Sequence, residues 1–341
     1  MKALFRILSL NLAIGLLLGI LALALVEGWL RLAIPASSSD SIFEYTLQTE
    51  RYKVMRPNAE VMAWGVPLRT NDLGFRDERP YGVAKRPGEY RVVVIGDSFT
   101  VSAGVEQQRL YTSLLEQRLK AQHPDVRVFN LAVAGYNVVQ YAMLLKEVAL
   151  PLDPDMVVVA LFPTNDFSNE TYADNRERAL GAPPPPAPPW HEQLYVYQAY
   201  LGRVEARVRG WLAPAGAAKG PAQDPALAAW GENIAALDEL AQEVRARDIV
   251  LGVVVLPHTW NFERQRPLHQ QVDAHCRARG LSCLGLLERF IAAGVRESTL
   301  RLNPLDSHPN AAYNALVAQE VAPLVEQHLA PHAAATLAAD Q

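Results

Sequence analysis

The sequence predicts an α/β fold in which a parallel sheet is covered on both faces by helices. From Arg91 onward, short and almost entirely apolar runs alternate with amphipathic segments, and such runs are typical of strands buried on both faces. Regular alternation of strands and helices favours parallel pairing. With 341 residues, 20% charged and 50% hydrophobic, the chain is long enough to form one large domain of this kind or two smaller ones.

Five strands and five helices follow one another along the chain. The expected strands are 91–96, 126–133, 155–162, 248–256 and 281–287. The expected helices are 110–122, 138–150, 227–247, 268–280 and 310–329. The first of these helices places four leucines on one face, as an amphipathic helix that packs on a sheet requires.

The first 35 residues are predicted to form a membrane anchor. Lys2 and Arg6 precede an uncharged, apolar stretch from 7 to 26, and twenty helical residues span about 30 Å, the thickness of a bilayer core. A cleaved signal peptide is the alternative, although its apolar region is usually only about 7 to 15 residues long. The positive-inside tendency keeps the two basic residues in the cytoplasm. The rest of the chain is then expected outside the inner (cytoplasmic) membrane, in the periplasm of a Gram-negative cell.

The remainder of the chain divides into four parts. Residues 36–90 are expected to form a tether and an irregular layer on the main domain, which spans 91–330. Within that domain, residues 171–226 contain the run "GAPPPPAPPW", which excludes helix and central strand and favours an extended surface insertion. Residues 331–341 are expected to form a flexible tail.

Charge, cysteine content and motifs exclude several classes of function. A net charge of −4 gives no basic face for nucleic acid. Cys276 and Cys283, without clustered histidines, do not make a zinc site. A disulfide between them suits an oxidising compartment, and two buried thiols fit the sequence equally well. A phosphate-binding module built on helix N-termini is the non-enzymatic alternative, and the absence of both Gly-x-Gly-x-x-Gly and a P-loop argues against it. No cofactor is expected.

Polar residues gather where the predicted strands end. Ser98, in Gly-Asp-Ser, follows the first strand, Gly135 the second and Asn165 the third, while Asp306 and His308 precede the last helix. Since the carboxyl ends of parallel strands meet at one edge of a sheet, these groups are expected to lie close together. The alternative for Gly-Asp-Ser is a turn in which Asp or Ser caps the next helix.

Together these residues supply the parts of serine-based acyl transfer. A neutral serine is a poor nucleophile, so Ser98 needs His308 as a base and Asp306 to orient that base. The backbone N–H groups of Ser98 and Gly135 and the side-chain amide of Asn165 would stabilise the oxyanion. Gly135 suits this role because the absence of a Cβ lets its N–H approach closely.

These blocks resemble the SGNH/GDSL hydrolase superfamily over about residues 71–330. "NDLGFRDERP" followed by "YRVVVIGDSFTVSAGV" is similar to its membrane-anchored bacterial members in particular. The resemblance implies a flavodoxin-like three-layer fold with sheet order 2-1-3-4-5, and ester hydrolysis or acyl transfer without a metal. By motif it assigns Ser98 as nucleophile, Gly135 and Asn165 as oxyanion donors, and His308 as base.

Three positions depart from the pattern of that superfamily. Pro163 stands where the block around the asparagine usually has glycine, and Ser102 replaces a glycine common after the nucleophile turn. The usual last block is Asp-x-x-His, whereas Asp306 lies only two residues before His308. Leu305, at the superfamily's acidic position, cannot serve as the acid. The shorter spacing resembles the alginate O-acetyltransferase branch.

The predicted function is that of a membrane-anchored, extracytoplasmic serine esterase or acyltransferase. Its expected substrates are O-acyl groups, foremost O-acetyl, on envelope or exported carbohydrate, with a membrane-bound acyl-transfer protein as a candidate partner. A lipid esterase similar to lysophospholipases or thioesterases is one alternative, and a non-catalytic scaffold of this fold in envelope assembly is another. His258, which also follows a strand, is the alternative base. Asp166 is expected to be structural, and the insertion to supply a lid or acceptor groove.

Overall fold

A five-stranded parallel sheet forms the centre of the larger of two units in the computed structural model, which describes residues 2–202, 204–205 and 229–339. The strands are β5 (Tyr90–Gly96), β6 (Val126–Asn130), β7 (Met156–Leu161), β8 (Val250–Val255) and β9 (Cys283–Gly285). Every neighbouring pair is parallel, and the spatial order is β6-β5-β7-β8-β9. The predicted fold class and the predicted order 2-1-3-4-5 are therefore confirmed.

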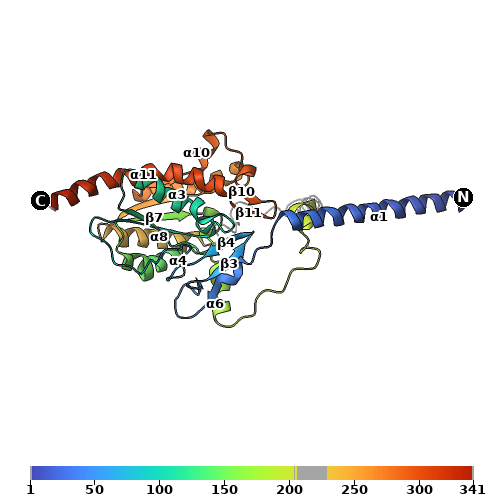
Figure 1. The fold of residues 1–341 in the computed structure, drawn as a ribbon, viewed down its shortest axis with the longest axis horizontal. Coiled ribbons are helices and arrows are strands. Elements are labelled where there is room, and N and C mark those ends of the chain that lie inside the picture. The colour runs from blue at the N-terminus through green and yellow to red at the C-terminus, as the bar shows by residue number, and fades with distance from the viewer. Residues whose placement is uncertain (1, 203, 206–228, 340–341) are drawn as a thin grey trace. The chain divides into compact units, whose positions relative to one another are not determined.

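Helices cover both faces of this sheet (Figure 1). Val92 and Val94 point into a core shared with α3 (Tyr111–Lys120), α10 (Leu287–Ala292) and α11 (Ala311–Ala339). Val93 and Ile95 point into the opposite core, shared with α4 (Val138–Leu144) and α8 (Trp230–Arg245). Because all of β5 is buried, its sequence is an apolar run rather than an alternating one. Each fully buried valine or isoleucine of this strand stabilises the fold by about 1.5–3 kcal/mol, because its side chain is removed from water.

Two β-hairpins lie in the segment that was expected to be irregular, which corrects that expectation. They pair β1 (Phe43–Tyr45) with β2 (Lys53–Met55), and β3 (Glu60–Ala63) with β4 (Val66–Arg69). The second hairpin turns at Trp64 and Gly65, both with positive φ, as a tight hairpin turn requires. Strands of three or four residues are too short to show a period of two in the sequence.

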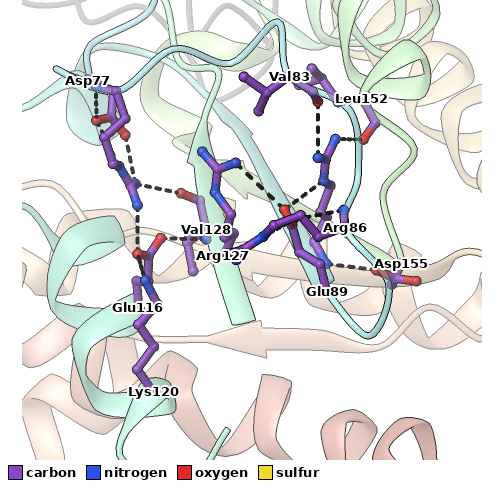
Figure 2. A network of polar contacts seen from close by, with 12 residues as sticks. Asp77, Val83, Arg86, Glu89, Glu116, Lys120, Arg127, Val128, Leu152 and Asp155 are labelled. Carbon is purple, nitrogen blue, oxygen red and sulfur yellow. Dashed lines mark hydrogen bonds and ion pairs between the residues drawn. The ribbon is translucent and has the colours of Figure 1, made fainter. Parts of the chain in front are cut away.

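Ion pairs with buried carboxylates attach the remainder of this N-terminal layer to the sheet (Figure 2). Arg79 joins Asp77 to Glu116 on α3, with N–O distances of 2.9 and 2.7 Å. The second oxygen of Glu116 accepts the backbone N–H of Val128 on β6. Glu116 and Asp77 are buried, at 6% and 5% exposed, whereas the Arg79 side chain that joins them is 40% exposed. Glu116 also pairs with Lys120 at 2.6 Å, so two cations share the buried carboxylate.

Several helix boundaries differ from the prediction. The helix expected at 268–280 begins at Phe262 and ends at Arg279 (α9), with Pro267 inside it. The Asn261 side chain accepts the N–H of Arg264, so an N-cap starts the helix upstream of Pro267 and of the expected first residue. The helix expected at 138–150 leaves regular α geometry after Leu144 through a π-helical turn. The last helix, α11, continues to Ala339, into the segment expected as a tail.

Cys276 and Cys283 form a disulfide, with their Cα atoms 6.1 Å apart. The bridge joins the end of α9 to the start of β9. The sequence left open a disulfide or two buried thiols, and the structure has the disulfide.

The smaller unit comprises residues 1–36 and 185–218. Its helix α1 (Lys2–Ala33) contains one segment, Ser9–Ala33, long and apolar enough to cross a membrane. Near the end of α1, the Glu27 carboxylate accepts the backbone N–H groups of Tyr195 and Val196, at 3.1 and 2.9 Å. The second part of the insertion therefore belongs with α1, whereas its first part forms α6 (Glu170–Ala179) in the larger unit.

Candidate active site

Ser98 is the first residue of α2 (Ser98–Val101), directly after the central strand β5. Gly96 permits this sharp change of direction, because a Cβ there would lie 2.4 Å from Thr100 Oγ1 and 3.3 Å from the Ala160 side chain. The Asp97 side chain caps the helix by accepting the N–H of Phe99 at 2.9 Å. The strand thus ends on a turn that leaves Ser98 partly exposed at the carboxyl edge of the sheet.

Arg76 holds the far end of this turn. Its guanidinium is buried, at 1% exposed, and donates to the carbonyls of Val101, Ser102 and Val105. Ser102 has a φ of 48°, the left-handed conformation that explains why the superfamily commonly has glycine there. The buried cation supplies donors to carbonyls at the end of this short helix and in the turn that follows it.

Asp306 and His308 lie on β11 (Asp306–Pro309), which pairs with β10 (Arg301–Asn303). Residues two apart on a strand point to the same face, so the Asp-x-His spacing places the two side chains next to each other. Asp306 Oδ1 lies 2.6 Å from His308 Nδ1 and also accepts the His308 backbone N–H at 2.8 Å. The spacing that departs from the superfamily pattern therefore still gives a histidine–carboxylate pair.

Trp64 completes the environment of the carboxylate. Its indole Nε1–H donates to Asp306 Oδ2 at 2.7 Å, from the turn between β3 and β4. Burial acts to raise the pKa of Asp306, but the His308 and Trp64 hydrogen bonds and the His308 charge hold it below its ordinary value. The carboxylate therefore remains ionised and presents one oxygen to each ring.

The helix that begins at Ser98 contacts the strand that carries His308. The ring of Phe99 lies 5.6 Å from the His308 ring, centroid to centroid. Within the described residues, Ser98 Oγ forms no hydrogen bond to His308 and instead lies 3.4 Å from Asp97 Oδ2. Nucleophile–base hydrogen bonds are often long in ligand-free enzymes and shorten when substrate binds.

The charges around His308 favour a protonatable imidazole. Burial alone would lower its pKa, but the Asp306 hydrogen bond and charge, with a contribution from Asp97, raise the pKa above its ordinary value. His258 has the opposite environment, because burial and the His308 charge lower its pKa to about 3. Its buried Nδ1 has no hydrogen-bond partner among the described residues. Of the two histidines, His308 alone is paired with a carboxylate.

Gly135 and Asn165 follow the strands on either side of β5. Gly135 has a φ of +80°, in the turn before α4. Asn165 lies in α5 (Pro163–Asp166). The Asn165 side-chain amide is assigned the orientation in which its nitrogen faces hydrogen-bond acceptors. In this orientation it donates to Asp97 Oδ2 and to the Phe162 carbonyl, both at 3.2 Å. The amide thus lies next to the residue that precedes Ser98, and would have to leave one of these acceptors to donate elsewhere.

Two buried carboxyl groups lie beneath this turn. Burial raises the pKa of Asp97 to about 6, although hydrogen bonds and the His308 charge act in the other direction. Burial and the Asp97 charge raise the pKa of Asp166 well above its ordinary value. Asp166 accepts the N–H of Phe162 at 2.6 Å and the hydroxyl of Tyr141 at 3.0 Å. Its bonds connect the turn after β7 to α4.

Trp64 and Arg76 were missed at the sequence level. Both come from the layer before β5, where no periodic pattern draws attention to single residues. The "NDLGFRDERP" block contains Arg76, but an arginine in a loop is usually read as solvent-exposed. Only its burial against three carbonyls reveals that it supports the Ser98 turn.

Comparisons with known proteins identify the family of this chain. Residues 94–316 match the model of the GDSL-like lipase/acylhydrolase family, and no curated protein matches the chain. The solved structure of TesA is 16% identical, with a TM-score of 0.41, covering 68% of this chain and 96% of its own. A catalytic mutant of Axe2, an acetylxylan esterase from Geobacillus stearothermophilus, is 14% identical, with a TM-score of 0.42 and coverages of 70% and 94%.

The acetyl xylan esterase AlAXEase is likewise 14% identical, with a TM-score of 0.43, covering 69% of this chain and 99% of its own. The matched family segment spans more than half of the chain. It contains the end of β5, the four other strands of the central sheet, α2 and β11. The chain therefore belongs to the GDSL-like lipase/acylhydrolase family and is an SGNH-type ester hydrolase.

Proposed function

We propose that the protein is a membrane-anchored, extracytoplasmic serine esterase or acyltransferase that acts through Ser98, His308 and Asp306. The observation that carries this proposal is the 2.6 Å contact between Asp306 Oδ1 and His308 Nδ1, on a strand that contacts the helix beginning at Ser98. With Nδ1–H donated to Asp306, His308 Nε2 is left as the acceptor for the Ser98 proton.

In the first half-reaction, Ser98 Oγ attacks the ester carbonyl carbon while His308 accepts its proton. The tetrahedral intermediate then collapses, His308 returns that proton to the leaving alcohol, and an acyl-serine remains. The backbone N–H groups of Ser98 and Gly135 and the Asn165 amide are the proposed oxyanion donors, each worth about 3–4 kcal/mol. Water or a second alcohol, activated by His308, completes the cycle.

Anchoring and location are supported by two features outside the site. The Ser9–Ala33 segment of α1 contains an 18-residue stretch with a mean hydropathy of 2.4, none of which is buried in protein. The Cys276–Cys283 disulfide suits an oxidising compartment. Protease added to intact spheroplasts should therefore digest the chain beyond about residue 40, and full protection would contradict the periplasmic assignment.

For the substrate we propose O-acyl esters, foremost O-acetyl, on envelope or exported carbohydrate. Trp260 supports a flat, ring-shaped substrate, because its side chain is 46% exposed and packs edge-on against His258 at 5.5 Å. The His258 ring in turn lies 5.4 Å from Phe99, the residue after the nucleophile. Exposed aromatic faces beside a reactive group commonly line ligand sites. The Asp-x-His resemblance to the alginate O-acetyltransferase branch points to the same class.

The test uses an activated acetyl ester with and without envelope glycan oligomers. Wild-type protein should release a burst of leaving group, one per enzyme, that is absent in Ser98→Ala. A transferase would consume the ester faster with glycan and yield acetylated sugar, whereas an esterase would release only free acetate. Trp260→Ala should raise the KM for acetylated glycan without changing the burst, while Leu47→Ala, at another exposed apolar side chain outside the insertion, serves as the control. An unchanged KM in Trp260→Ala would contradict the carbohydrate proposal.

A further inference from the structure

Lys53 is a buried ammonium group without a carboxylate partner. It lies on β2 and is 8% exposed. Among the described residues, no carboxylate lies within the 4.0 Å of an ion pair. Its Nζ instead donates to the Ala134 carbonyl at 3.0 Å and lies 3.9 Å from the centroid of the Phe43 ring. Burying a charge without an opposite charge costs several kcal/mol, so the position calls for an explanation beyond packing.

Among the described residues, the Lys53 ammonium donates one hydrogen bond, to the carbonyl of the residue before Gly135. A Cβ on Gly135 would lie 3.4 Å from Lys53 Nζ, so the ammonium lies directly against the proposed oxyanion glycine. The attachment is double, because the Tyr136 hydroxyl donates to the Lys53 backbone carbonyl. Arg51, two residues earlier, donates to that same hydroxyl at 3.2 Å. Arg51 and Lys53 therefore both hold the loop between β6 and α4.

This contact determines the direction of the Gly135 N–H. The Ala134–Gly135 peptide is trans, and in a trans peptide the carbonyl oxygen and the amide hydrogen point in opposite directions. A donor fixed on the Ala134 oxygen therefore aims the Gly135 N–H away from Lys53. Glycine at a φ of +80° has an unusually wide choice of conformations, so without this donor the peptide plane would be free to rotate.

We propose that Lys53 is a positioning residue that fixes the Ala134–Gly135 peptide plane and, through its charge, strengthens the Gly135 N–H as an oxyanion donor. A cation on the carbonyl oxygen withdraws electron density from the amide, which makes its N–H more acidic and a stronger donor. The inference rests on the proposed oxyanion role of Gly135. It assigns the N-terminal layer, which lies outside the matched family segment, a part in catalysis.

The charge on Lys53 titrates in an accessible range. Burial lowers its pKa to about 8, and the Arg178 charge acts in the same direction, while Asp40 and Asp174 raise it. Asp40 lies in the 3-10 turn Ser39–Ile42, and the other two groups lie on α6. Below this pKa the ammonium is charged, and above it the charge is lost. The proposal therefore predicts a fall in kcat as pH rises through about 8.

The experiment compares Lys53→Met, Lys53→Arg and Lys85→Met with wild type. Methionine keeps the length of the stem and removes the charge, and arginine keeps the charge at every pH used. Lys85 pairs with Asp155 just before β7, at the opposite edge of the sheet from Gly135, and is the matched control. The readouts are kcat and KM for an activated acetyl ester from pH 6 to 10, and the rate at which a fluorophosphonate modifies Ser98.

Lys53→Met is expected to lower kcat by about tenfold to a hundredfold, less than removal of an oxyanion donor itself, with KM almost unchanged. The fall of kcat near pH 8 should disappear in this variant. The fluorophosphonate should modify Ser98 more slowly by a similar factor. Lys53→Arg should retain most of the activity and also lose the limb. Lys85→Met should behave as wild type.

A folded Lys53→Met protein with wild-type kcat and a wild-type alkaline limb would overturn the inference. If that variant does not fold, Lys53→Arg decides, because an alkaline limb that stays near pH 8 in the arginine variant shows that Lys53 is not its source. Ser98→Ala separates this failure from failure of the proposed function. If Ser98→Ala is inactive while Lys53→Met is normal, only the inference fails, and if Ser98→Ala turns over normally, both fail.

Discussion

Replacing Asp306 with asparagine tests how the carboxylate serves His308. The carboxylate accepts three hydrogen bonds, two at Oδ1 from His308 and one at Oδ2 from Trp64 Nε1. Asparagine has one acceptor oxygen, so it can keep either the two bonds to His308 or the one to Trp64. We expect the oxygen to stay on the His308 side, since that orientation preserves more bonds. The imidazole then keeps the tautomer that leaves Nε2 as the acceptor.

The loss of activity then comes from the charge alone. A hydrogen bond to a charged group contributes about 1.5–3 kcal/mol, and His308 is partly exposed, so we take the lower part of that range. A loss of about 1.5–2 kcal/mol lowers kcat by about 10- to 30-fold. Burial acts to lower the pKa of His308, and Asp306 outweighs it, so removing the charge moves the acid limb of the pH profile to lower pH.

Stability should fall as well, through Trp64. The asparagine nitrogen would face the indole N–H, donor to donor, and a partly buried donor left unpaired costs about 1 kcal/mol. Adding Trp64→Phe removes that donor, so the double variant should recover most of the unfolding free energy without recovering kcat. The assays are hydrolysis of an activated acetyl ester from pH 5 to 9 and urea unfolding. An unmoved acid limb, or a loss of kcat as large as that of His308→Ala, would refute the reasoning.

Three further predictions concern other parts of the chain. His308→Ala should lower kcat by several orders of magnitude with little effect on folding. The kcat of His258→Ala should stay within about tenfold of wild type. If steady-state assays show the larger loss of kcat in His258→Ala, His258 is the base. Reducing Cys276–Cys283 should lower the unfolding free energy by about 2 kcal/mol, the value for so short a loop, and leave kcat unchanged; a large loss of kcat on reduction would contradict this. Arg76→Met should destabilise the protein by about 3 kcal/mol, because buried carbonyls lose their donor, and an unchanged urea midpoint would contradict its assigned role.

The central sheet could be predicted from the sequence because its strands are buried on both faces. Runs such as 92–95 are apolar for that reason, and the polar residues after each strand mark one edge of the sheet. The order of the strands came from the superfamily resemblance, because apolar runs do not identify their neighbours. Asp306 and His308 could be paired in advance only as a motif, and β11 explains physically why a spacing of two suffices.

The contributions of the N-terminal layer could not be predicted in the same way. Trp64, Arg76 and Lys53 act through contacts with residues far away in the sequence, and no local pattern encodes such contacts. The start of α9 was misplaced because the capping side chain of Asn261 outweighs the unfavourable Pro267. In both cases tertiary or capping interactions decided a feature that local propensity alone does not determine.

The central claim is that Ser98 is the nucleophile of a histidine-assisted acyl transfer. The most direct measurement is labelling of the folded wild-type protein with a fluorophosphonate, followed by mass mapping of the modified peptide. The account predicts one adduct per chain, on Ser98, that is absent in Ser98→Ala and forms orders of magnitude more slowly in His308→Ala. An adduct on any other serine, or no adduct in protein shown to be folded, would contradict it.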